Sequence, residues 1–134
     1  MMADQRLTQE QSAIGLRTAL RIIGGWQASA AQACKILRIS RSTYRRVSQG
    51  SGAGGRLDLD QHQRIGLVLG IHAALRSVFT NQMNVQGFLG FKNQNEFFEG
   101  RSPLEIMSQG DMISLYETYK RIDQLQRIGE VWVK

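Results

Sequence analysis

Helix-start signals, rather than the alternating pattern of strands, recur along this chain. The clearest is Ser102-Pro103-Leu104-Glu105, in which serine can cap a helix, proline fits its first position and glutamate can return a hydrogen bond to the cap. Thr8–Gln11 has the pattern of a second capping box, and Asp58–Asp60 places carboxylates where a helix begins. Proline occurs once, and apolar residues recur at helical spacing. We therefore predict an all-α fold.

One flexible, low-complexity segment divides the predicted helices. Gln49–Gly55 is rich in glycine and serine, and the charge pattern changes where it ends. We therefore predict two parts, a helix-turn-helix domain over residues 1–56 and a helical domain over residues 57–134.

Charge is distributed unevenly between these two parts. No acidic residue occurs between Glu10 and Asp58, whereas acids and bases nearly balance from Leu57 onward. The acid-free interval contains eight basic residues: Arg17, Arg21, Lys35, Arg38, Arg41, Arg45, Arg46 and Arg56. A one-sided positive field of this kind attracts a polyanion and is screened by salt. The pattern favours nucleic acid as a partner over an incidental basic surface.

A candidate recognition element lies inside the basic interval, at residues 28–48. We expect a helix from Trp26 to Leu37, in which small residues such as Ala30 and Ala33 would let the following helix cross closely. That following helix would be short and capped by Ser40. We expect Arg41, Ser42 and Arg45 to reach base edges, because arginine makes bidentate contacts to guanine. Neighbouring residues complete the predicted double-stranded DNA-binding set, some of them suited to phosphates or packing: Lys35, Ser40, Thr43, Tyr44 and Arg46.

The sequence contains no catalytic or metal-binding pattern. His62 and His72 lie ten residues apart on one predicted helix, with no cysteine or carboxylate at ligand spacing. Cys34 is the single cysteine, which suits a reducing cytoplasm and a small buried role. No run approaches the roughly 20 apolar residues of a membrane span. We expect a cytoplasmic binding protein, with no enzymatic activity, cofactor, metal or membrane.

Taken together, the two parts resemble the Xre/ParS-type antitoxins, whose partners are RES-domain toxins. The more specific part of the resemblance is C-terminal. It includes Gln63–Leu75, Phe79, the segment Phe98–Met107 with its Gly-Arg-Ser-Pro-Leu core, and Trp132. The chain departs from the family in its tail, where Arg127–Trp132 contains a single glycine, and at Lys92-Asn93, where the family has Pro-Asn.

The resemblance implies an Xre/Cro-like helix-turn-helix followed by a toxin-binding helical domain. It implies a type II antitoxin that blocks the active site of a RES-type, NAD-consuming toxin and represses its own operon. The toxin-binding residues that it implies are Gly100, Arg101, Ser102, Pro103, Leu104, Arg121, Arg127 and Trp132. For each of these residues a structural role is an alternative, since Ser102 and Pro103 suffice to start a helix and Trp132 could cover the core.

Two other functions are compatible with the same residues. In one, the chain is a stand-alone transcription regulator whose C-terminal half is a dimerisation module. In the other, it is a structural adaptor with an incidental basic surface. We expect a homodimer, because helix-turn-helix proteins usually read two half-sites related by two-fold symmetry.

Overall fold

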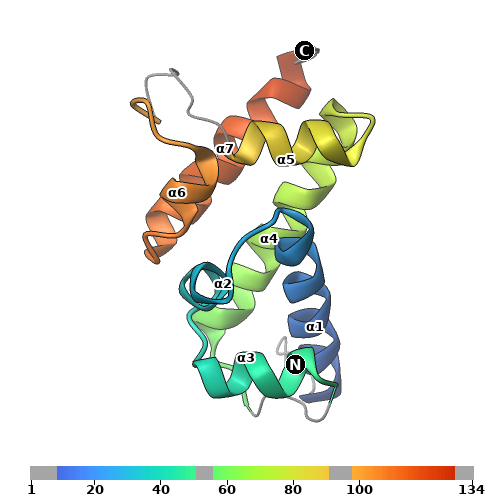
Figure 1. Cartoon of the computed structure of the whole chain (residues 1–134), viewed down its shortest axis with the longest axis vertical. Coiled ribbons are helices and arrows are strands. Elements are labelled where there is room, and N and C mark those ends of the chain that lie inside the picture. Colours follow the sequence, from blue (N-terminus) through green and yellow to red (C-terminus); the bar gives the residue numbers. More distant parts are fainter. Residues whose placement is uncertain (1–8, 51–55, 91–97, 129–134) are drawn as a thin grey trace, which may run out of the picture.

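The computed structural model describes residues 9–50, 56–90 and 98–128, with side chains described through Leu125. All regular structure in these ranges is helical, which confirms the predicted all-α class (Figure 1). The helices in chain order are α1 (Gln9–Gly25), α2 (Ala30–Leu37), α3 (Arg41–Ser48), α4 (Leu59–Val78), α5 (Gln82–Gly90), α6 (Pro103–Met107) and α7 (Met112–Ile128).

The long helix α4 connects the two ends of the molecule. Helices α1, α2 and α3 gather around its N-terminal half, and α5, α6 and α7 lie toward the other end (Figure 1). Its most extensive contacts are with α7 and then with α1. The α4–α7 contact is close because Gly70 faces the ring of Tyr119, and a Cβ at Gly70 would lie 3.0 Å from its Cε1 atom. We conclude that α4 is the central helix, against which helices from both halves of the chain pack.

The hydrophobic core is continuous along α4. It contains Trp26 and Leu37 from the N-terminal helices, Ile71 from α4, and Met107 and Ile122 from the C-terminal helices, all essentially buried. One core therefore contains residues from both sides of residue 56, where the sequence predicts a domain boundary. The division into two domains stays a prediction, and the two parts share packing.

Side-chain caps define most helix starts. Complete capping boxes occur at Ser29–Gln32, Asp58–Gln61 and Ser102–Glu105, the last with proline in the first turn as the sequence predicts. The sequence predicts a second helix from Trp26 to Leu37, but α2 begins four residues later. Gln27 has a left-handed φ of 67° and Ser29 caps the helix, so Trp26 lies in a turn with its side chain in the core. Thr8 lies outside the described residues.

Polar contacts hold the ends of α1 against its neighbours. The side-chain amides of Gln82 and Gln86 in α5 both donate to the carbonyl oxygen of Gly25 at 2.8 Å, which satisfies the C-terminus of α1. Near the other end of α1, Ser12 Oγ lies 2.7 Å from His62 Nε2 of α4. These contacts fix α1 along α4 and thereby fix the helices that follow it.

Candidate nucleic-acid interface

The exposed face of α3 carries the side chains that the sequence predicts for DNA. Ser40 caps the helix by accepting a hydrogen bond from the Thr43 backbone amide at 3.0 Å. Val47 is buried and Tyr44 is half-buried against the core, so these two residues anchor the helix. The opposite face is left to Arg41, Ser42 and Arg45, which are all exposed.

The remaining predicted DNA-binding residues fall into two groups. Arg46 is exposed and its Nη1 donates to Ser42 Oγ at 3.2 Å, so both side chains lie on the outer surface of α3. Thr43 is half-buried and accepts from Ser40 Oγ at 3.0 Å, which gives it a role in the cap. Lys35 is on α2, where its Cβ and carbonyl oxygen lie beside Gly110. The structure brings Ser40–Arg46 together and places Lys35 next to the α6–α7 turn.

The turn between α2 and α3 is made by Arg38, which has the left-handed conformation φ 57°, ψ 50° that closes α2. Its backbone N–H and that of Ile39 both donate to the carbonyl oxygen of Cys34. Glycine adopts this conformation without steric cost, whereas other residues pay for it. An arginine here therefore needs a compensating contact.

That contact is made with the start of α4. The Arg38 guanidinium forms ion pairs with Asp58 and with Asp60, the latter at 2.6 Å. The hydrogen bond from Arg38 lowers the pKa of both carboxyl groups, and the same contacts raise the pKa of the guanidinium, with the bond to Asp58 as the first cause. The first two acids after the basic interval therefore pair with an arginine of that interval at the turn.

A second arginine on α4 joins this turn to the C-terminal helices. Arg64 is a buried charged residue, 5% exposed, and it pairs with Asp60 at 2.9 Å. Its Nη1 lies 3.3 Å from the carbonyl oxygens of Lys35 and Ile36 at the end of α2, and 2.8 Å from that of Gly110. One guanidinium thus binds carbonyls from both halves of the chain, as its planar set of donors allows.

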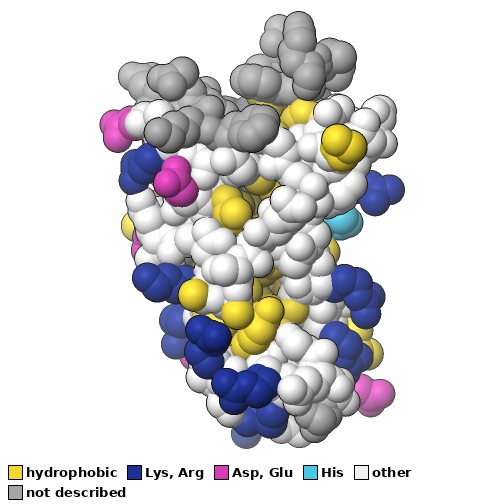
Figure 2. All heavy atoms as spheres, viewed as in Figure 1, with side chains coloured by type: hydrophobic (Ala, Val, Ile, Leu, Met, Phe, Trp, Pro, Cys, Tyr) yellow, Lys and Arg dark blue, Asp and Glu magenta, His cyan; other side chains and the backbone are white. Residues whose placement is uncertain are grey.

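The charge of the surface agrees with this arrangement. Figure 2 shows most of the visible lysine and arginine side chains over the half of the molecule formed by α1, α2 and α3.

Cys34 is half-buried on α2, and burial raises the pKa of its thiol, which disfavours the reactive thiolate. Among the described residues no three His, Cys, Asp or Glu side chains are grouped to hold a metal ion. The same residues include no helix long and apolar enough to cross a membrane.

The predicted toxin-binding segment starts a helix whose first residues are covered. Ser102, Pro103 and Leu104 are buried, and the backbone turns into them through left-handed Glu99 and Gly100. Arg101 is exposed beside Glu99, with its Nη2 atom 3.7 Å from the carboxylate. Arg121 is half-exposed on α7 and pairs with Glu117 at 3.7 Å. The Arg127 side chain and Trp132 lie outside the described residues.

Sequence reasoning did not assign the arginines that organise this interface. Arg64 sits in the apolar run Gln63–Leu75, and nothing in the sequence shows that two chain reversals bring carbonyls to it. Arg17 and Arg21 belong to the basic interval, in which the sequence gives neither an individual role, and both are exposed on α1 beside the end of α3. Their i, i+4 spacing was the one available signal that they share a face.

The geometry defines the class of the protein, an all-helical helix-turn-helix protein with a basic recognition helix. In agreement with this, residues 5–70 match the model of the antitoxin Xre-like helix-turn-helix domain. A curated relative, the uncharacterized protein y4oB of Sinorhizobium fredii (strain NBRC 101917 / NGR234), is 32% identical over 109 residues, which cover 81% of each chain. No solved structure matches the chain significantly. The chain belongs to one family with y4oB, and its residues 5–70 are similar to the antitoxin Xre-like helix-turn-helix domain, a regulatory type of domain.

Proposed function

We propose that this protein is the antitoxin of a type II toxin–antitoxin pair and represses its own operon. The observation that carries the proposal is the exposed face of α3, with Arg41, Ser42 and Arg45, within a domain of the antitoxin Xre-like family. A short helix with polar and basic side chains at its N-terminal end can enter the major groove and read base edges. DNA and a partner enzyme that consumes NAD would both be met in the cytoplasm.

The proposed toxin is a RES-type enzyme, and the C-terminal helices hold it. This part rests on the resemblance of the Gly100–Leu104 segment to the family's toxin-binding pattern. Since Ser102, Pro103 and Leu104 are buried, Gly100 and Arg101 are the residues of that segment that a partner can reach directly. Trp132, Arg127 and Arg121 complete the proposed contact with the toxin.

We also propose that the protein acts as a homodimer whose copies meet over α4 and α7. A hollow of about 380 Å³ between these helices is lined by Gly66, Leu67, Met112 and Tyr116, together with Gln63. Apolar side chains on the same two helices are exposed: Leu59 is 67% exposed and Ile113 is 72% exposed. A Cβ at Gly66 would meet nothing within 4 Å, so a second helix can approach closely there. Exposed apolar surface of this kind is typical of protein–protein contacts.

The same apolar surface supports the second candidate function, a stand-alone transcription regulator. In that case α4–α7 form a dimerisation module and no toxin is bound. The two candidates share the DNA-binding half and differ only in the second protein partner.

The deciding experiment is co-expression with the product of the adjacent gene. The antitoxin function predicts that the two proteins purify as a stable complex and that NAD consumption by the neighbour ceases at saturating antitoxin. If the neighbour binds but still consumes NAD at full rate, the inhibition is disproved. If no neighbour binds, the stand-alone regulator is the better account.

A further inference from the structure

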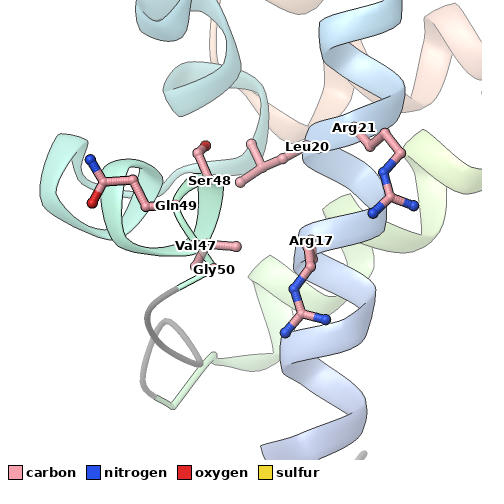
Figure 3. Close-up of a pocket in the computed structure, with 7 residues that line it drawn as sticks. All are labelled: Arg17, Leu20, Arg21, Val47, Ser48, Gln49 and Gly50. Carbon is pink, nitrogen blue, oxygen red and sulfur yellow. The ribbon is translucent and has the colours of Figure 1, made fainter.

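A hollow lies beside the recognition helix, between α1 and the C-terminal end of α3 (Figure 3). It holds about 330 Å³. Leu20 and Val47 give it an apolar lining, Ser48, Gln49 and Gly50 form one wall, and Arg17 and Arg21 of α1 form the other. Both arginine side chains extend in the same direction along α1 (Figure 3).

Within the described part of the chain, no acidic side chain pairs with either arginine. Arg17 and Arg21 are exposed, and neither has an ion pair within the described part of the chain. Their spacing places them on one face of α1, where like charges four residues apart repel weakly. The nearest acid along α1 is Glu10, about 10 Å below Arg17 at the helical rise per residue. An anion bound between the two guanidinium groups would remove this repulsion.

The hollow lies at the C-terminal end of α3, and this position favours a DNA phosphate as the anion. Arg41 and Arg45 of α3 and Gln49, the residue that caps its C-terminal end, follow one another at four-residue spacing, so this exposed row ends at the hollow. Helix α3 is about 12 Å long, which is about the width of the major groove. When its N-terminal end touches base edges, its C-terminal end lies at the phosphates that border the groove, and so do the arginines next to it.

We propose that Arg17 and Arg21 form a clamp for the DNA phosphate backbone at the edge of the groove that α3 enters. The guanidinium fork matches phosphate oxygens in bidentate geometry, and the apolar lining of Leu20 and Val47 fixes the two helices that bear the clamp. The clamp positions the protein on the duplex and reads no sequence. This inference rests on the proposed DNA-binding function and extends it to α1.

The test compares the wild type with R17Q/R21Q, using as probes the duplex upstream of its own gene and a random duplex of equal length. Binding is measured over a series of salt concentrations. Each phosphate contact contributes about 0.9 to the slope of log affinity against log salt. We expect the double variant to lose about 1.8 from this slope and to bind both probes more weakly by the same factor, on the order of tenfold or more.

Three controls make the result specific. R76Q removes an exposed arginine of α4 at the other end of the molecule and leaves the slope unchanged. R17K/R21K retains the charge and regains most of the slope. Calorimetry with inorganic phosphate tests whether Arg17 and Arg21 bind a free anion instead. The clamp is disproved if R17Q/R21Q abolishes the heat of phosphate binding but leaves DNA binding intact.

The remaining outcomes separate this inference from the proposed function. A wild type that binds the upstream duplex, together with an R17Q/R21Q variant of unchanged salt slope, disproves the clamp alone. A wild type that binds neither duplex disproves the DNA-binding function and the clamp with it.

Discussion

Nη1 of Arg64 donates a hydrogen bond of 2.8 Å to the carbonyl oxygen of Gly110, which links α4 to the turn between α6 and α7. The same atom lies within hydrogen-bonding distance of two carbonyls at the end of α2, the first helix of the helix-turn-helix. The turn between α6 and α7 and the helix that precedes α3 therefore share one hydrogen-bond donor. One buried side chain therefore links the helix-turn-helix to the C-terminal helices.

Replacing Arg64 is expected to destabilise the whole chain. Arg64→Ala leaves Asp60 with one partner fewer and three carbonyls without their donor, and losses of this kind cost about 3 kcal/mol or more. Arg64→Lys should recover only part of this, because an ammonium group cannot span the same acceptors. Urea unfolding measures the change, with the exposed Arg76→Ala as the matched control. A loss below about 0.5 kcal/mol, the range of neutral surface changes, would contradict this role.

Arg41→Ala and Arg45→Ala are expected to weaken binding to the upstream duplex while the fold is retained. Both side chains are exposed and neither is part of the core. Loss of a bidentate contact to guanine costs about 1–3 kcal/mol of discrimination, so binding to the random duplex should fall much less. Gel-shift titration of both probes measures the ratio. Unchanged affinity in both variants would exclude α3 as the reading element.

Features that depend on local sequence could be predicted, whereas contacts between distant segments could not. The helices and their caps follow from local chemistry, so Ser102-Pro103-Leu104-Glu105 and Ser40 could be placed correctly from short motifs. The basic face of α3 follows as well, because helical periodicity separates Val47 from Arg41 and Arg45. Arg64 could not be predicted, since its acceptors are 28 to 46 residues away and depend on how the helices pack. The predicted start of α2 at Trp26 is wrong, because Trp26 is apolar at a helical position but lies in a turn, from which its side chain is buried.

The left-handed conformation of Arg38 predicts that glycine is more stable than alanine at this position. Arg38→Gly loses the ion pairs with Asp58 and Asp60 but relieves a conformation that costs a non-glycine residue about 1 kcal/mol. Because exposed ion pairs are worth little, this variant should be at least as stable as the wild type. Arg38→Ala loses the same pairs and keeps the strain, so it should be less stable than Arg38→Gly by about 1 kcal/mol. Equal stability of the two variants in urea would show that the turn is not strained.

The carboxyl groups at the start of α4 predict how stability depends on pH. The hydrogen bond from Arg38 holds the pKa of Asp58 and Asp60 below the ordinary value of 3.8. A carboxyl group with a lowered pKa in the folded state stabilises the protein fully above its unfolded pKa. That stabilisation is lost as the pH falls through the lower, folded pKa.

We therefore expect the urea midpoint of the wild type to decrease as the pH falls below about 4. Arg38→Ala removes the main cause of the shift, so its midpoint should fall less steeply over the same range. A residual slope remains in that variant, because Arg64 still lowers the pKa of Asp60 and the Gln61 backbone still lowers that of Asp58. The Asp111 carboxyl, whose pKa is lowered by a hydrogen bond from the Ser114 backbone, also contributes. Parallel curves for the two proteins would show that the ion pairs of Arg38 with Asp58 and Asp60 do not contribute to the pH dependence.

The proposed dimer surface is tested by two substitutions of equal chemistry on different helices. Ile113 is 72% exposed on α7 next to the hollow lined by Met112 and Tyr116, and Met83 is 81% exposed on α5. Ile113→Glu would place a charge in a contact that excludes water, at a cost of several kcal/mol per dimer if the charge stays unpaired. Light scattering should therefore find Ile113→Glu as a monomer and Met83→Glu as a dimer at the same concentration. A dimer that survives Ile113→Glu unchanged would move the interface away from α4 and α7, because the substituted side chain would then still be in water.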